Sequence, residues 1–91
     1  MPVCKHLGIY GRVQGVGFRY AFADRANELG LTGWVRNRFD GSVEAVVQGE
    51  PDAVEQMIKW TKSGPDFARV DRVEASEAEG NFRQFEIRGT N

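Results

Sequence analysis

The chain has 91 residues, a formal net charge of −1 at pH 7 and a hydrophobic share of 41%, so we expect residues 1–91 to form a single small domain. The near-zero charge argues against a generally basic nucleic-acid binder, and no apolar run reaches membrane-spanning length. The lone Cys4 can form no internal disulfide or cysteine metal cluster, and the N-terminus lacks the layout of a signal peptide, so a cytoplasmic protein without membrane association is expected.

Hydrophobic periodicity divides the chain into strands and helices. Alternation predicts a half-buried first strand with Leu7 and Ile9 on its inner face, and Phe18, Phe22 and Ala26 then follow at helical spacing. In chain order, the expected elements are a strand over 4–13, a helix over 18–29, strands over 31–37 and 42–48, a helix that opens at 49–51 and ends at 64–65, a charged edge strand over 69–79 and a short strand over 82–88.

This order is βαββαβ with one additional strand at the end. Right-handed crossovers would place both helices on one face of an antiparallel sheet. We therefore predict the α+β class and a two-layer, ferredoxin-like sandwich with a short C-terminal strand. In such a sandwich, the loop after the first strand lies at one end of the sheet, next to Asn37 on the neighbouring strand.

A glycine-rich segment over 11–19 joins the first strand to the first helix. Glycine allows positive φ and brings backbone N–H groups close to a ligand, and a helix N-terminus attracts anions. Arg19 adds a guanidinium that matches phosphate oxygens. Residues 1–38 hold six basic and two acidic residues, whereas 39–91 hold six and eleven, so the basic excess lies beside the loop. From this segment alone, an anion site and a plain glycine turn with a solvated arginine are equally good interpretations.

A second notable segment is the Gly-Trp-Val-Arg-Asn run over 33–37, followed by Gly-Ser-Val over 41–43 and by Gly49. The amide of Asn37 can both donate and accept, so it can hold a water molecule in one orientation. Considered alone, an asparagine that satisfies its own turn is the better interpretation.

Together, the two segments resemble the two signatures of the acylphosphatase family, at the right separation and over nearly the whole chain. The resemblance implies hydrolysis of the carboxyl–phosphate bond of acyl phosphates, with inorganic phosphate as product. By the same resemblance, Arg19 binds phosphate and Asn37 positions the attacking water. The residues whose backbone amides would cradle the phosphoryl oxygens are Gln14, Gly15, Val16, Gly17, Phe18 and Arg19.

The chemistry of an acyl phosphate agrees with this set of residues. A carboxylate leaving group has a parent pKa of about 4, so it departs at neutral pH without a protonating acid. Positioning and charge neutralisation remain, which amides and an arginine can supply. We therefore expect direct attack by water without metal, cofactor or phosphoenzyme, on a small-molecule substrate, in a monomer.

Two alternatives remain at this point. The same loop could bind a phosphorylated or carbamoylated ligand without turnover, as a non-catalytic anion-binding module. The same topology could also bind single-stranded RNA through an exposed patch of Tyr10, Trp34 and Arg36 on the helix-free face. Those aromatics are sparse and the net charge is unfavourable for such a binder.

Overall fold

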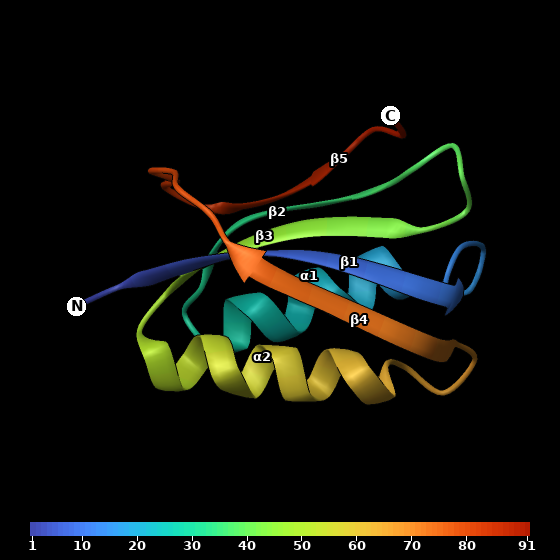
Figure 1. Cartoon of the computed structure of the whole chain (residues 1–91), viewed down its shortest axis with the longest axis horizontal. Helices are drawn as coiled ribbons and strands as arrows, with labels where there is room; N and C mark the ends of the chain where they lie inside the picture. Colours follow the sequence, from blue (N-terminus) through green and yellow to red (C-terminus); the bar gives the residue numbers. More distant parts are fainter.

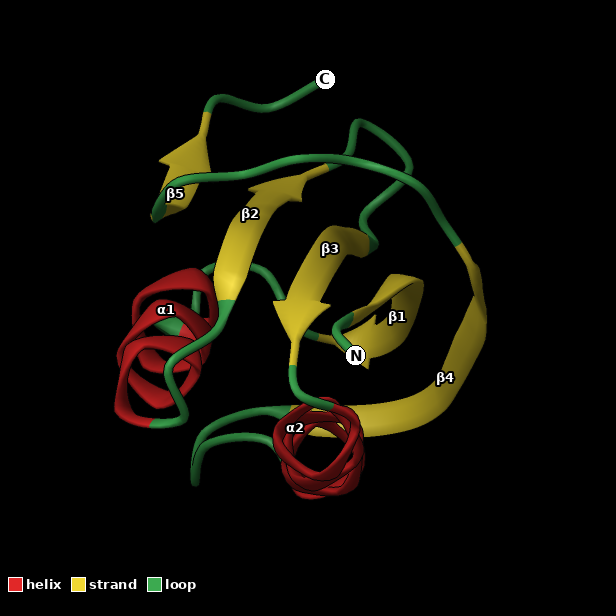
Figure 2. Ribbon diagram, turned by 90° about the vertical axis from the view of Figure 1, so that its left-hand side faces the viewer, coloured by secondary structure: helices red, strands yellow, loops and turns green.

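Two helices pack on one face of a five-stranded sheet in the computed structural model, which describes residues 1–91 (Figure 2). The predicted βαββαβ order and the two-layer α+β fold are confirmed. In chain order, the elements are β1 (Val3–Arg12), α1 (Phe18–Glu28), β2 (Thr32–Asn37), β3 (Val43–Gly49), α2 (Pro51–Ser63), β4 (Arg69–Glu77) and β5 (Phe85–Arg88).

The strands lie in the order β4-β1-β3-β2-β5. The four longer strands pair antiparallel, whereas β5 pairs parallel to β2, so the prediction of an antiparallel sheet holds only for four strands. The direction of β5 follows from its connection: β4 and β5 are joined at the end of the sheet where β4 finishes (Figure 1). β5 therefore runs opposite to β4 and in the same direction as β2. The charged strand β4 forms an edge, as predicted.

The main core fills the space between the sheet and the helices. The predicted inner residues of α1, namely Phe18, Phe22 and Ala26, are buried there with Leu7 and Ile9 of β1. The ring centroids of Phe18 and Phe22 lie 6.0 and 6.1 Å from the ring centroid of Trp60 on α2. These aromatic contacts hold the two helices together. This packing fixes the start of α1 against the end of β1.

The helix-free face carries a second, smaller cluster. Cys4, Trp34 and Val46 are buried there, with Phe82 from the connection between β4 and β5 packed against them. Trp34 is only 8% exposed, and the guanidinium of Arg36 lies 4.7 Å from its ring. The indole is therefore covered, and the possibility of an exposed Trp34 patch for RNA is wrong.

Neither α1 nor α2 combines the length and the apolar character that crossing a bilayer would require.

Candidate active site

Three connecting segments meet at one end of the sheet (Figure 1). They are the glycine loop over 13–17 between β1 and α1, the turn over 38–42 between β2 and β3, and the segment over 64–68 between α2 and β4. Residues far apart in sequence are thus gathered around the N-terminus of α1.

The glycine loop has the backbone geometry that only glycine adopts readily. Gly15 and Gly17 have φ values of +74° and +77°, and a Cβ added at either position would meet no atom within 4 Å. Glycine is therefore required by the backbone conformation and not by crowding. The unfilled space leaves room for a ligand to approach the loop closely.

The N-terminus of α1 offers unpaired donors to such a ligand. Gly17 is the N-cap, no side chain caps the helix, and its first turn contains no acidic residue. The amide of Ala21 donates to the carbonyl of Gly17 at 3.1 Å, so the amides of Phe18, Arg19 and Tyr20 precede the first intrahelical bond. This end of the helix favours an anion.

A pocket of about 170 Å³ lies over the loop and the helix start. It brings together Arg19 and Asn37, which are 18 positions apart in the chain, as expected. The expectation that Asn37 lies on the strand next to β1 is wrong, however, because Asn37 ends β2 and β3 lies between β1 and β2. The residues that line the pocket are Val13, Gly15, Gly17, Phe18, Arg19, Tyr20 and Asn37. Of the predicted phosphate cradle, Val16 lines a neighbouring hollow instead, and Gln14 lines neither.

Arg19 and Asn37 are held in different ways. The Nη1 of Arg19 donates to the carbonyl of Arg88 on β5 at 3.4 Å, a long contact that leaves its other donors available. The side-chain Oδ1 of Asn37 is buried and has no hydrogen-bond partner, while the backbone carbonyl of Asn37 accepts from the amide of Asn91 at 3.0 Å. A buried acceptor without a partner calls for a donor such as water.

The side chain of Gln14 has a role that no pattern in the sequence predicts. Its Nε2 donates to the carbonyls of Arg38 at 2.7 Å and of Ser42 at 2.8 Å. The turn is tightened further by Asp40, whose Oδ1 accepts from the hydroxyl of Ser42 at 2.6 Å and from its amide at 2.9 Å. These two hydrogen bonds lower the pKa of Asp40. Gln14 thus ties the glycine loop to the turn that follows Asn37.

Behind Asn37, a buried carboxylate connects three strands. Glu44 on β3 accepts from His6 Nε2 on β1 at 2.6 Å and from Arg36 Nη2 on β2 at 2.7 Å, with Arg38 Nη1 at 3.6 Å. Burial alone would raise the pKa of Glu44, but the hydrogen bonds and charges of His6 and Arg36 outweigh it and lower that pKa. The network fixes the strand end that carries Asn37.

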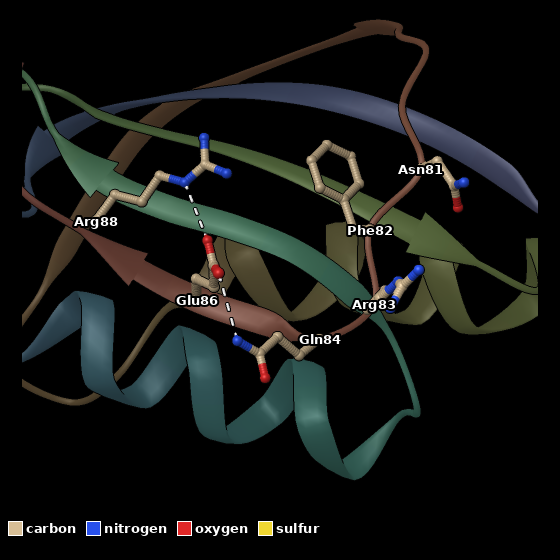
Figure 3. A pocket seen from close by; sticks show the side chains of 6 residues that line it. All are labelled: Asn81, Phe82, Arg83, Gln84, Glu86 and Arg88. Atoms are coloured by element: carbon tan, nitrogen blue, oxygen red, sulfur yellow. Dashed lines mark hydrogen bonds and ion pairs between the residues drawn. The ribbon is translucent and has the colours of Figure 1, made fainter.

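A larger hollow of about 470 Å³ lies along β5 and the residues before it (Figure 3). Two of its three charged side chains already pair, because Glu86 accepts from Arg88 Nε at 3.3 Å, and Glu86 also accepts from the Gln84 amide Nε2 at 3.4 Å. No residue of the glycine loop lines this hollow, and Asn37 does not line it either. We therefore assign the candidate site to the smaller pocket.

Comparison with known proteins agrees with this assignment. The model of the acylphosphatase family matches residues 5–87. The chain belongs to the acylphosphatase family. An acylphosphatase from Thiobacillus denitrificans is 57% identical over 83 residues, which cover 91% of this chain and 93% of that one. As a member of this family of hydrolases, the protein hydrolyses acyl phosphates to a carboxylate and phosphate.

Solved structures extend the match to the fold. An acylphosphatase from Coxiella burnetii superposes with a TM-score of 0.93 at 39% identity, covering 96% of this chain and 93% of that one. The chain also matches 12% of full-length HypF, with a TM-score of 0.92 at 30% identity over 99% of this chain. The acylphosphatase fold therefore occurs both in chains of this length and as part of a much longer one.

Proposed function

We propose that Arg19 and the loop amides hold the phosphoryl group of an acyl phosphate, while Asn37 orients the water that attacks phosphorus directly. The observation that carries this proposal is the pocket that Arg19, the glycine loop and Asn37 line together, with the Oδ1 of Asn37 buried and lacking a hydrogen-bond partner. In this proposal, no metal takes part and no phosphoenzyme forms.

Neutralisation of charge is the first task in this mechanism. The transferred phosphoryl group spreads negative charge over its equatorial oxygens. The amides from Gln14 to Arg19 and the guanidinium of Arg19 would donate to those oxygens. Donors held in place before the reaction need no reorganisation when the charge develops, which is the main source of rate enhancement in such sites.

Positioning of water is the second task. The Oδ1 of Asn37 would accept one hydrogen of the water, so that an oxygen lone pair of the water faces phosphorus. The second proton would pass to a phosphoryl oxygen of the substrate. A leaving carboxylate with a parent pKa of about 4 departs without protonation, so the reaction demands no general acid.

The arrangement of the core also supports a single domain. Its 13 buried residues come from both helices, three strands and the loops next to them, so no part of the chain has a separate core. We propose that residues 1–91 act as one monomeric, cytoplasmic domain with a small-molecule substrate and no nucleic-acid partner. Sedimentation of the purified protein at several concentrations tests the monomer.

Hydrolysis of benzoyl phosphate in the presence of chelator tests the mechanism, with Arg19→Ala and Asn37→Ala compared with the parent protein. We expect Arg19→Ala to lose both turnover and phosphate binding, because it removes the only side-chain cation that lines the pocket. Asn37→Ala should lower kcat about 100-fold or more. It should nevertheless keep the thermal stabilisation that phosphate gives by binding the folded state.

Three results would contradict the proposal. If Asn37→Ala loses phosphate affinity and keeps kcat, the role of Asn37 is wrong. If chelator abolishes turnover, or a phosphorylated side chain accumulates, direct metal-free attack by water is wrong. If the parent shows no turnover although phosphate protects it from unfolding, the site is an anion-binding module.

A further inference from the structure

A second hollow, of about 510 Å³, opens beside the glycine loop. It is lined by Arg12, Gly15, Val16 and Phe67, and it shares Gly15 with the pocket that holds Arg19 and Asn37. The two cavities are therefore neighbours that meet at the backbone of the loop.

They lie on opposite sides of that loop. Asn37 is the last residue of β2, whereas Phe67 lies in the segment that leads into β4. In the sheet order β4-β1-β3-β2-β5, strand β1 lies between β4 and β2, and β1 leads directly into the glycine loop. Figure 1 shows this arrangement at the end of the sheet: the 38–42 turn and the 64–68 segment flank the loop.

Phosphoryl transfer requires the attacking water and the leaving group to lie on opposite sides of the phosphorus atom. The attacking and leaving oxygens lie roughly in line through phosphorus. If Asn37 holds the water, the acyl group must leave on the side away from Asn37, which is the side of Phe67. We propose that the hollow between Arg12, Val16 and Phe67 binds the acyl group, and that the enzyme favours acyl phosphates with an aryl acyl group. This inference rests on the water-positioning role proposed for Asn37.

Phe67 presents an apolar ring to that group from a segment whose backbone is constrained. Its side chain is 83% exposed, and the segment around it is held by backbone hydrogen bonds from Gly64 to the carbonyl of Trp60 at 2.8 Å and from Ala68 to the carbonyl of Pro65 at 3.0 Å. An exposed ring on a constrained segment can pack against a flat substrate at little entropic cost.

The charge of the hollow suits a departing carboxylate. The guanidinium of Arg12 makes no ion pair or hydrogen bond with another side chain, whereas the nearby Arg69 is paired with Asp71 at 3.1 Å. Asp66 precedes Phe67 and is exposed. Arg12 thus supplies an uncommitted positive charge where the leaving carboxylate forms.

Phe67→Ala tests the proposal against a matched control, Phe39→Ala. Phe39 is 86% exposed, lies on the 38–42 turn and lines neither cavity. The measurement is the ratio of kcat/KM for benzoyl phosphate to that for acetyl phosphate. We expect Phe67→Ala to lower this ratio about tenfold, the size of effect that a small apolar contact has on specificity. Phe39→Ala should leave the ratio at the parent value.

Binding of two inert analogues, 2-oxo-2-phenylethylphosphonate and 2-oxopropylphosphonate, separates this inference from the proposed function. Calorimetry should show that Phe67→Ala weakens the phenyl compound about tenfold relative to the methyl compound. An unchanged ratio in both experiments, or an equal change in Phe39→Ala, overturns the acyl site. If the parent shows no turnover but Phe67→Ala still weakens binding of the phenyl analogue, the catalytic proposal is contradicted and the acyl site is supported.

Discussion

Gln14 shows how a single side chain can support the site without lining it. Its two hydrogen bonds to the carbonyls of Arg38 and Ser42 join the glycine loop to the turn that follows Asn37. The side chain of Gln14 is half-buried. Without its amide group, the carbonyls of Arg38 and Ser42 would each lose one hydrogen-bond donor. Gln14 therefore fixes the distance between the two parts of the pocket.

Gln14→Ala should destabilise the protein by about 1–2 kcal/mol, because it removes two hydrogen bonds of about 1 kcal/mol each. Activity should fall as well, since the loop and Asn37 lose their common attachment. Urea unfolding and kcat with benzoyl phosphate measure the two effects. Gln84→Ala, an exposed glutamine before β5, is the control and should change stability by less than about 0.5 kcal/mol. Equal stability of the two variants would contradict the bracing role.

The residues of the site were predictable to different degrees. The glycine loop, Arg19 and Asn37 belong to short local patterns, and the predicted order of helices and strands along the chain placed them at one end of the sheet. The side-chain contacts of Gln14 depend on a turn 24 positions away, so no local pattern reports them. The same holds for His6 and Glu44, which are 38 positions apart and meet only because β1 pairs with β3.

At the scale of the elements, β2 depends on a glycine within the strand. Gly33 has a φ of +133°, and a Cβ there would collide with the carbonyl of Val46 on β3. On its other side, the amide of Gly33 donates to the carbonyl of Gln84 at 3.0 Å, where the chain enters β5. Gly33 thus lets β2 approach β3 closely while it pairs with β5.

Gly33→Ala should cost about 2–5 kcal/mol, because it adds both backbone strain and a steric clash. Thermal and urea unfolding measure the loss. Gly89→Ala is the matched control: a Cβ at Gly89 meets no atom within 4 Å, and its backbone is not in the positive-φ region. If both substitutions are equally well tolerated, close approach of β2 and β3 is not what requires glycine at position 33.

β5 marks the limit of prediction at this scale. Its existence follows from the alternation near the end of the chain, but its partner and direction do not. They depend on how residues 78–84 cross from one edge of the sheet to the other and on Phe82 packing against the cluster with Trp34. A pattern of four residues cannot encode a crossing of that length, so the parallel pairing appears only in three dimensions.

At the scale of the whole molecule, the Glu44 network makes stability depend on pH. The pKa of Glu44 is lower in the folded protein than its ordinary value of 4.5. The contribution of this ionised carboxylate is therefore fully present above pH 4.5 and is lost as the pH falls through the lower, folded value.

Glu44→Gln should cost about 2 kcal/mol at pH 7, because it removes hydrogen bonds to a charged group, and the difference from the parent should shrink below pH 4.5. Urea unfolding at pH 7 and at several acidic values measures this convergence. Glu55→Gln, an exposed site on α2, is the control and should follow the parent at every pH. A difference between parent and Glu44→Gln that grows on acidification would contradict the sign of the effect.

The two edges of the sheet have a consequence for the protein at high concentration. Along β4, charged side chains pair as Arg69–Asp71, Arg72–Glu74 and, with β1, Lys5–Glu77. The opposite edge, β5, has only four residues and carries the Glu86–Arg88 pair. A second copy that added a strand to either edge would have to strip water from these charges. In the folded protein, neither edge therefore offers a long apolar strand to which a second copy could add.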